Sequence, residues 1–238
     1  MSTPTPVTIL GSTGLTGSET LHALLTSSHP FSITTATRRP IPSPFPKCKP
    51  TNAQTVLDER IYPSLFDAPA DTARGKLVQE GGVYVSCLAT TRVNGKETQE
   101  KVDWELNRDL ATRAKADGAR TAILVSGSHA SPDSSFFYLR IKGQLEEHLT
   151  TLGFNHVVIL KPGMLLGHRE RVDWAEIGLQ KLFGWARWAG VGTDALAVDG
   201  KDVGACIANL IEYPPLEKHL ILGNRDIIAR ARLLRASR

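Results

Sequence analysis

Short apolar runs alternate along the chain with longer segments in which apolar residues recur every three or four positions. The short runs predict strands, and the longer segments predict helices. The predicted strands are Val7–Leu10, Phe31–Thr37, Thr55–Leu57, Val83–Leu88, Thr121–Val125 and His156–Leu160. The predicted helices are Leu15–Thr26, Asp71–Gln79, Thr98–Ala116, Phe136–Leu152, Trp174–Trp185 and Val203–Ile211. This alternation predicts an α/β fold of the Rossmann type, a doubly wound parallel sheet with helices on both faces.

Length and composition favour one globular domain. The chain has 238 residues, of which 41% are hydrophobic and 22% are charged, enough to bury a substantial core. Proline occupies every second position from Pro40 to Pro46, which excludes a helix there and predicts an irregular loop after the second strand.

A glycine-rich turn joins the first predicted strand to the first helix. It reads Gly11, Ser12, Thr13, Gly14, Leu15, Thr16, Gly17. Glycines at this spacing permit a tight turn and a close approach of the main chain to a pyrophosphate, which the N–H groups of the helix start then face. The spacing differs from the more familiar G-x-G-x-x-G, and an ordinary strand-to-helix loop is the alternative. The turn predicts a dinucleotide cofactor.

Arg38 and Arg39 end the second predicted strand, where dinucleotide folds contact the adenosine ribose. No Asp or Glu lies between Glu19 and Asp58 to accept the ribose hydroxyls. Two guanidinium groups can hold a 2′-phosphate through charge-assisted hydrogen bonds. NADP(H) is therefore predicted over NAD(H), with a solvated arginine pair as the alternative.

Further candidates follow the other strands, because ligands bind at the carboxyl ends of parallel strands. Asp58 follows the third predicted strand and is either an acceptor for an adenine amino group or a solvated acid. The small segment Leu88, Ala89, Thr90 allows close approach of a cofactor, and Ser126 ends the fifth strand.

Tyr138 and Lys142 are four residues apart on a predicted helix, so they share a face. The ammonium favours loss of the phenol proton, which makes Tyr138 a candidate general acid. A tyrosine on the apolar face with a lysine beside it is the structural alternative.

Several classes of partner and site are not expected. Cys48, Cys87 and Cys206 are far apart, which indicates a reducing compartment, and no histidine spacing suggests a metal. No apolar run is long enough for a transmembrane segment, no aromatic and basic pattern suggests nucleic acid, and the absence of Arg and Lys before Arg38 argues against a cleaved leader. Five C-terminal arginines indicate either a solvated helix face or peripheral contact with an acidic membrane; they are Arg225, Arg230, Arg232, Arg235 and Arg238.

Five motifs occur together in a characteristic order. They are Gly11–Gly17, Cys87–Arg92, the Ser126 segment, Tyr138–Gly143 and Leu160–Gly163. In this set the chain resembles the atypical short-chain dehydrogenase/reductases of the Tat-interacting-protein type and their fungal mitochondrial outer-membrane relatives. The likeness covers nearly the whole chain.

The resemblance implies a single Rossmann domain over residues 1–238, NADP(H) and a Ser-Tyr-Lys catalytic set. Residues 1–160 would form the cofactor half, and residues 161–238 a substrate-side lid and terminal helices. Tyr138 would protonate a carbonyl oxygen, Lys142 would bind the nicotinamide ribose, and Ser126 would hold the substrate oxygen. Pro162 and Gly163 would border the nicotinamide, and Asn107 would complete a proton relay. The location implied is the cytoplasm or the cytosolic face of the mitochondrial outer membrane.

The chain departs from this family pattern at two places. Relatives commonly have Ser-Ser, a small residue and Gly where this chain has Ser126, Gly127, Ser128 and His129, so either serine is a candidate to face the substrate. Ala89 stands where the family usually has Gly.

The expected activity is hydride transfer between NADPH and a carbonyl or alcohol substrate. Aromatic residues in the C-terminal third favour an apolar or aromatic substrate; they are Trp174, Phe183, Trp185 and Trp188. Core packing is the alternative role for them. The alternative functions are an NADP(H)-binding sensor or interaction protein without turnover, and a non-redox isomerase or cyclase on the same fold.

Overall fold

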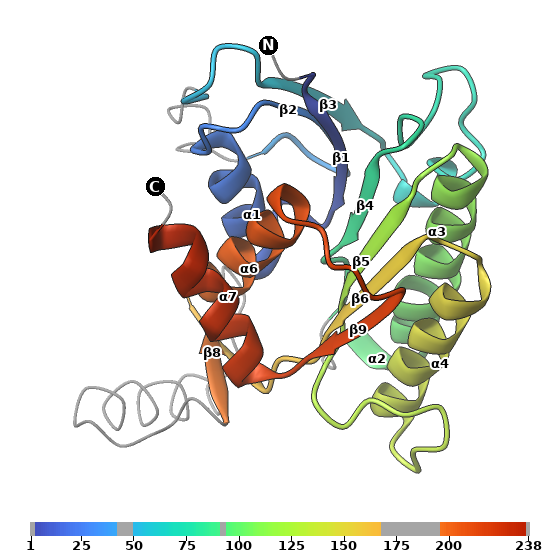
Figure 1. Cartoon of the computed structure of the whole chain (residues 1–238). Helices are drawn as coiled ribbons and strands as arrows, with labels where there is room; N and C mark the ends of the chain where they lie inside the picture. Colours follow the sequence, from blue (N-terminus) through green and yellow to red (C-terminus); the bar gives the residue numbers. More distant parts are fainter. Residues whose placement is uncertain (1–2, 42–49, 91–93, 168–195, 237–238) are drawn as a thin grey trace.

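A seven-stranded parallel sheet forms the centre of the molecule, in a computed structural model that describes residues 3–41, 50–90, 94–167 and 196–236 (Figure 1). The strand order is β3-β2-β1-β4-β5-β6-β9. The strands are β1 (Thr5–Leu10), β2 (Phe31–Thr37), β3 (Val56–Ile61), β4 (Val83–Ser86), β5 (Thr121–Val125), β6 (His156–Leu160) and β9 (His219–Leu222). The chain steps outward from β1 to β3 and then returns to β4 on the other side of β1. This reversal creates a topological switch point between β1 and β4, where ligands of such folds bind.

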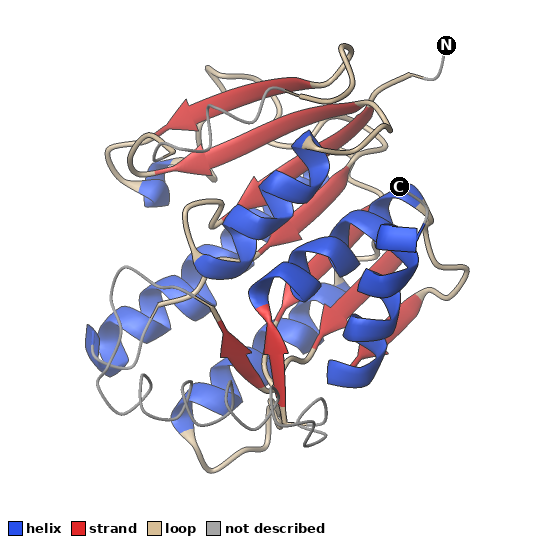
Figure 2. Ribbon diagram, turned by 90° about the vertical axis from the view of Figure 1, so that its left-hand side faces the viewer, coloured by secondary structure: helices blue, strands red, loops and turns tan. Residues whose placement is uncertain are grey.

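Helices cover both faces of the sheet, as the alternating pattern predicts (Figures 1 and 2). On one face lie α1 (Leu15–Leu25), α6 (Gly200–Glu212) and α7 (Asn224–Ala236). On the other lie α3 (Asn107–Ala116) and α4 (Phe137–Thr151). Each layer encloses its own buried apolar cluster against the sheet, which is the expected result of burying two apolar sheet faces. The predicted α/β Rossmann-type fold is therefore confirmed.

The helix before α3 contains an unusual turn. α2 (Gly95–Gln99) continues into η4 (Glu100–Leu106), which has π-helical hydrogen bonding, and then into α3. The side-chain amide of Asn107 donates to the carbonyl of Val102 over 2.9 Å. Turns of this kind occur often at functional sites. Here the turn places Asp103 and Asn107 in the interior, each about 1% exposed.

The predicted helix Asp71–Gln79 is wrong. Its backbone groups are committed elsewhere, since the Asp71 carboxylate accepts the N–H groups of Ala73 and Arg74. Leu77 donates its N–H to Asp117 and accepts the hydroxyl of Thr8. Between β3 and β4 the chain instead forms one short 3-10 helix, η2 (Leu65–Asp67).

The sheet also differs from the prediction at its two edges. β3 extends to Ile61, four residues beyond the predicted end at Leu57, and β9 was not predicted. Beside the sheet, β7 (Met164–Leu166) pairs with β8 (Ala197–Asp199). The predicted helix Trp174–Trp185, most of the proline loop and the four aromatics of the predicted substrate side lie outside the described residues.

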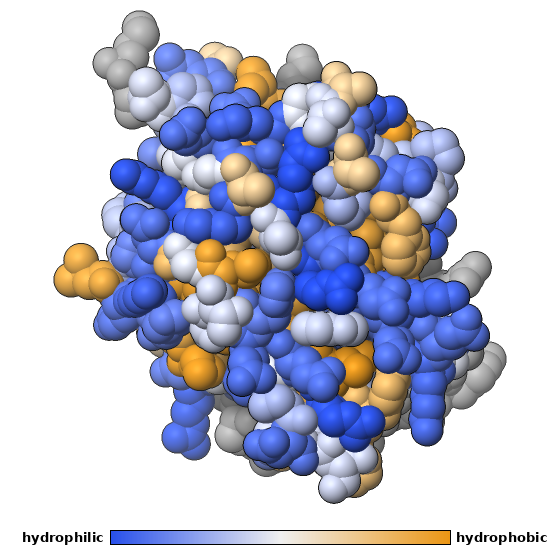
Figure 3. All heavy atoms as spheres, turned by 90° about the vertical axis from the view of Figure 1, so that its right-hand side faces the viewer, coloured by the Kyte–Doolittle hydropathy of each residue, from blue (hydrophilic) through white to orange (hydrophobic). Residues whose placement is uncertain are grey.

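The outer face of α3 and α4 is largely hydrophilic, with isolated hydrophobic residues (Figure 3). No helix in the described ranges has both the length and the apolar character needed to cross a membrane.

Candidate functional site

The glycine turn begins where β1 ends, and its shape requires glycine at two positions. Gly11 has φ of 74°, and a Cβ there would stand 2.6 Å from the carbonyl oxygen of Cys87 on the neighbouring strand end. A Cβ on Gly17 would stand 2.1 Å from the carbonyl oxygen of Gly11. The first glycine therefore permits the backbone turn, and the other lets α1 lie directly against it.

The turn presents hydrogen-bond donors, at the N-terminus of α1 and on Ser12, that are not paired with side chains of the described residues. Gly14 stands at the N-cap of α1 without a side-chain cap, and the first turn of α1 contains no acidic residue. The Ser12 hydroxyl is fully buried and lacks a hydrogen-bond partner among the described residues. Three features of this turn fit a diphosphate: the close backbone approach that its glycines allow, the Ser12 hydroxyl, and the N-terminus of α1, which has no side-chain cap.

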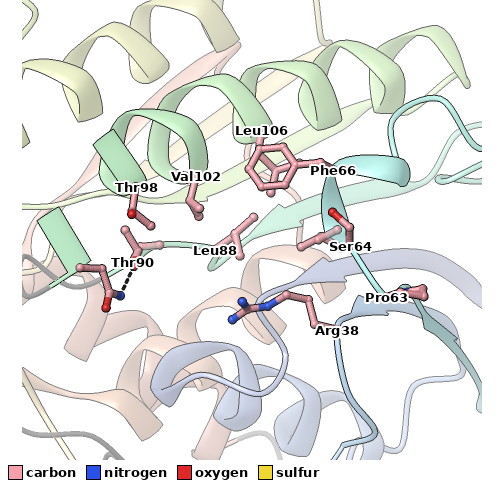
Figure 4. Close-up of a pocket in the computed structure, with 12 residues that line it drawn as sticks. Arg38, Pro63, Ser64, Phe66, Leu88, Thr90, Thr98, Val102 and Leu106 are labelled. Atoms are coloured by element: carbon pink, nitrogen blue, oxygen red, sulfur yellow. Dashed lines mark hydrogen bonds between the residues drawn. The ribbon is translucent and has the colours of Figure 1, made fainter. Parts of the chain in front are cut away.

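A pocket of about 520 Å³ opens at the carboxyl ends of β2, β3 and β4, and its lining contains no residue of the glycine turn. Arg38 extends into it from the end of β2, opposite Val102 and Leu106 (Figure 4). The remaining lining residues are Pro63, Ser64, Leu65, Phe66, Leu88, Ala89, Thr90, Asn94 and Thr98. Arg38 is the one charged side chain among these described lining residues. The described lining therefore offers one cation together with apolar and neutral polar side chains, and it contains no carboxylate.

Arg39 and Asp58 lie elsewhere. Arg39 is exposed and does not line the pocket. Asp58 does not follow β3 as predicted, because the strand continues for three residues beyond it. Its carboxylate forms an ion pair of 2.8 Å with Arg60. The expected acceptor position after β3 is occupied by Pro63, Ser64 and Phe66 instead.

The segment after β4 is held by two buried polar residues of the following helix. Asn107 accepts the Ser86 hydroxyl over 2.6 Å and donates to the Leu88 carbonyl over 3.3 Å. Asp103 accepts the N–H of Thr90 over 2.6 Å. Because the Asn107 side-chain amide is engaged by Ser86, Leu88 and Val102, it braces this segment, and its role in a proton relay stays a prediction.

Tyr138 and Lys142 share one face of α4, as their spacing predicts. The ammonium lies 5.3 Å from the centre of the Tyr138 ring. Lys142 is 6% exposed, whereas Tyr138 is half-buried. A buried cation under a more accessible phenol can assist proton transfer at the phenol oxygen.

Ser126 is turned into the protein interior. Its hydroxyl donates to Glu146 over 2.5 Å, and Glu146 forms an ion pair of 2.8 Å with Lys161. Lys161 also donates to the Ala130 carbonyl over 2.9 Å. The Ser126 proton is therefore engaged by a carboxylate and is not available to a substrate oxygen in this geometry.

The residues after Ser126 lie closer to the candidate site. A Cβ on Gly127 would stand 3.8 Å from the Lys142 side chain, and Ser128 is half-buried with its N–H on the Pro162 carbonyl. Among the described residues, His129 is the only one other than glycine that has a positive φ, at 63°. Gly163, in turn, donates its N–H to the Asn224 side chain over 2.8 Å.

Two acidic residues of this region were missed by sequence reasoning. Asp103 has one carboxylate oxygen without a hydrogen-bond partner among the described residues, and Glu146 anchors Ser126. Burial raises the pKa of the Asp103 carboxyl, while the Lys142 ammonium and the Thr90 N–H lower it in part. Asp103 lies one helical turn before Asn107, and Glu146 lies one turn after Lys142. Each acid therefore shares a helix face with a predicted site residue, and this spacing is a signal that the sequence contains.

Comparisons with known proteins agree with this architecture. A model of the HIM1 family matches residues 73–181. A solved short-chain dehydrogenase/reductase superfamily protein from Agrobacterium tumefaciens, with bound NAD, is 16% identical, has a TM-score of 0.61, and the match covers 91% of this chain and 76% of that one. At this identity the likeness shows the fold alone.

Fungal proteins are much closer in sequence. The mitochondrial protein FMP52 of Candida albicans is 30% identical over 95% of this chain and 98% of its own length. The mitochondrial protein fmp52 of Aspergillus fumigatus is 32% identical over 93% of this chain and 96% of its own. The resemblance to fungal mitochondrial relatives is thereby confirmed, and the chain belongs to the FMP52 family.

Proposed function

We propose that the chain is an NADP(H)-dependent oxidoreductase of the short-chain dehydrogenase/reductase type, acting on a carbonyl or alcohol substrate. The observation that carries this proposal is the pairing of a buried Lys142 ammonium with the accessible Tyr138 ring. The pair lies on a fold whose glycine turn fits a dinucleotide. The bound nicotinamide would supply or accept the hydride.

The choice of NADP(H) over NAD(H) rests on Arg38. Its guanidinium lines the pocket, and no carboxylate among the described lining residues could accept a ribose diol. In the described part of the chain, Arg38 makes no hydrogen bond or ion pair that would compete with a phosphate. Arg39 is proposed as a second, more peripheral phosphate contact.

In the proposed reaction, each residue of the chain has a limited task. Tyr138 donates a proton to the substrate oxygen in reduction and removes it in oxidation. Lys142 keeps a positive charge beneath the phenol and binds the nicotinamide ribose. Pro162 and Gly163 border the nicotinamide, next to Ser128. Ser126 could hold the substrate oxygen only after leaving Glu146, so Ser128 is the better-placed hydroxyl.

Binding measurements test the cofactor part of the proposal. The variant Arg38→Ala with Arg39→Ala should lose about 1–3 kcal/mol of NADPH affinity, because charge-assisted hydrogen bonds are lost, and should bind NADH nearly as before. Titration calorimetry with both cofactors measures this difference. Arg108→Ala, which removes an arginine from α3, is the matched control. Equal losses for NADPH and NADH would contradict a phosphate contact at this pair.

Turnover measurements test the catalytic part. The wild-type protein should oxidise NADPH in the presence of a substrate from a panel of ketones and quinones. Tyr138→Phe should abolish this oxidation while keeping NADPH affinity, because only the proton donor is lost. Unchanged turnover in Tyr138→Phe would refute the role of Tyr138.

A second function is favoured by one observation. Ser126 is committed to Glu146, and Gly127 offers no hydroxyl beside Lys142. A cofactor-binding sensor or interaction protein without turnover would not require a serine hydroxyl that faces a substrate. Tight NADPH binding without oxidation across the substrate panel would favour this function, and a redox-neutral product would favour the isomerase or cyclase.

The relatives' names suggest where the protein acts. Both FMP52 relatives are named mitochondrial. We propose the same organelle for this chain, with peripheral contact on the cytosolic face of the outer membrane through the arginines of α7. Fractionation of mitochondria, followed by protease and salt treatment, would test that location.

A further inference from the structure

β3 forms one edge of the central sheet, and β2 is its one partner among the described strands (Figure 1). Five of its six residues are exposed. The exposed side chains include three apolar ones, since Val56 is 56% exposed, Leu57 41% and Ile61 38%. Because neighbouring residues of a strand point to opposite faces, these side chains lie on both faces of β3. An uncovered strand edge is a template for pairing with another strand, so β3 is a candidate interaction surface.

The register of β3 on β2 shows which backbone groups point outward. Thr37 is the partner of Ile61, and the Thr37 carbonyl accepts the N–H of Tyr62 over 2.8 Å. In a parallel pair with this bonding, the backbone groups of Ile61 point away from β2, and so do those of Glu59 and Leu57 at intervals of two residues. Within the described ranges, no hydrogen bond engages the outward backbone groups of Leu57 and Glu59.

We infer that β3 pairs antiparallel with β3 of a second copy of this chain, about a two-fold axis at Glu59. Outward-pointing residues must stand opposite one another if the two strands are to exchange hydrogen bonds. With the axis at Glu59, Asp58 stands opposite Arg60 of the second copy. Leu57 then stands opposite Ile61. An axis one residue earlier would oppose two Asp58 carboxylates, and an axis one residue later would oppose two Arg60 guanidinium groups. The axis at Glu59 is therefore the complementary one of the three.

The charged face of β3 favours this register. Asp58 and Arg60 lie side by side on that face in an ion pair of 2.8 Å, and their side chains are 55% and 16% exposed. In the dimer each carboxylate also faces a guanidinium of the second copy, which produces a row of alternating charges across the axis. Opposite charges in directly opposed cross-strand positions stabilise strand pairing.

Two features of the edge weaken the dimer. The carboxylates of the two Glu59 residues meet at the axis, and like charges in that position repel. Each carboxylate accepts the N–H of Ile41 over 2.6 Å, which offsets part of the repulsion. The outward carbonyl of Ile61 accepts the Arg74 guanidinium over 2.9 Å, so it meets the second copy with its other lone pair. We therefore expect a dimer that dissociates on dilution.

Two neighbouring acids provide the first test, by sedimentation velocity over a range of protein concentrations. Asp58→Asn removes the attraction to Arg60 and should raise the dissociation constant of the dimer about threefold or more, because two symmetry-related pairs are lost. Glu59→Gln removes the repulsion at the axis, keeps an acceptor for the N–H of Ile41, and should lower the constant. Both variants change the net charge of the chain equally, so opposite shifts follow from the register. A wild-type chain that stays monomeric at every concentration, or shifts of the same sign, would overturn the inference.

Cross-linking tests the register directly, in a chain that carries Cys48→Ser and Cys87→Ser. Glu59→Cys places two thiols at the axis, with their Cα atoms about 5.5 Å apart, which a disulfide can span. Val56→Cys is the matched control, because this position is also exposed and its two copies are roughly 20 Å apart along the paired strands. Mild oxidation should yield a covalent dimer with Glu59→Cys and little with Val56→Cys. Equal yields, or none with Glu59→Cys, would contradict this pairing. Neither experiment uses a nicotinamide cofactor, so the outcome is independent of the proposed function.

Discussion

At the scale of single residues, Ser126 shows how local bonding changes the meaning of a motif. Its position after β5 predicts a group that faces a substrate. In the structure Ser126 is 7% exposed, and its hydroxyl joins Glu146 and Lys161 in a chain of polar contacts. These contacts connect the ends of β5 and β6 to the middle of α4. Ser126 is thus part of the support beneath the site.

Ser126→Ala should therefore affect stability more than cofactor binding. The substitution leaves one Glu146 oxygen without its donor in a buried setting, which costs about 1–3 kcal/mol for a hydrogen bond to a charged group. Denaturant unfolding measures the loss, and NADPH titration should show unchanged affinity. Ser128→Ala is the matched control. It should change the free energy of unfolding by about 0.5 kcal/mol or less, because substitutions outside the buried core usually have effects of this size. Equal losses in the two variants would contradict the supporting role of Ser126.

At the scale of secondary-structure elements, the position of α4 depends on a close contact of its backbone. A Cβ on Gly143 would stand 2.1 Å from the carbonyl carbon of Ser131 and 2.3 Å from the nitrogen of Pro132. Those neighbours are backbone atoms, so they cannot turn aside as a side chain would. The glycine beside Lys142 therefore sets how closely the helix carrying Tyr138 approaches the loop after β5.

Gly143→Ala should move α4 away from that loop. Overpacking of this kind costs about 1–3 kcal/mol, and the displaced helix should also weaken turnover if Tyr138 is the proton donor. Gly127→Ala is the matched comparison, because its Cβ would meet Lys142 at an ordinary 3.8 Å. It should leave the unfolding free energy within about 0.5 kcal/mol of wild type. Thermal unfolding of both variants measures the contrast, and a stable Gly143→Ala protein would show that the contact is not restrictive.

Elements with a strong apolar pattern could be predicted closely from the sequence. β2, β5 and β6 have the predicted bounds, and α1 differs by one residue at its end. Asp71–Gln79 failed because Asp71, Thr8 and Asp117 satisfy its backbone groups, which is a tertiary effect invisible to local pattern. β9 was missed because two of its four residues are exposed and its apolar run is short.

The candidate site could be predicted only where one element carries the signal. The glycine turn and the pair on α4 are local motifs, and the structure forms both. Asp58 was placed wrongly because the end of β3 is set by its pairing with β2, which extends as far as Thr37 and Ile61. Asp103 was missed because its burial depends on the π-helical turn and on packing between separate helices.

At the scale of the whole molecule, one sheet serves two apolar clusters. The cluster under α1, α6 and α7 includes Cys206, which is fully buried, and the other lies under α3 and α4. β1, β4, β5 and β6 contribute side chains to both clusters. Neither layer can therefore open fully without exposing one face of the shared strands, which favours cooperative unfolding.

The Cys206 thiol provides a test of this cooperativity. Burial raises the pKa of Cys206 to about 12, and the thiolate is the reactive form, so labelling at pH 8 requires opening of the α6 layer. In a protein carrying Cys48→Ser and Cys87→Ser, a thiol reagent should leave Cys206 unlabelled in native buffer. With added denaturant, labelling should follow the same midpoint as the loss of circular dichroism. Leu216→Cys, at a position 97% exposed, is the positive control and should label at once. If Cys206 became reactive well below the global midpoint, the α1, α6 and α7 layer would open by itself, and the shared sheet would not couple the two halves.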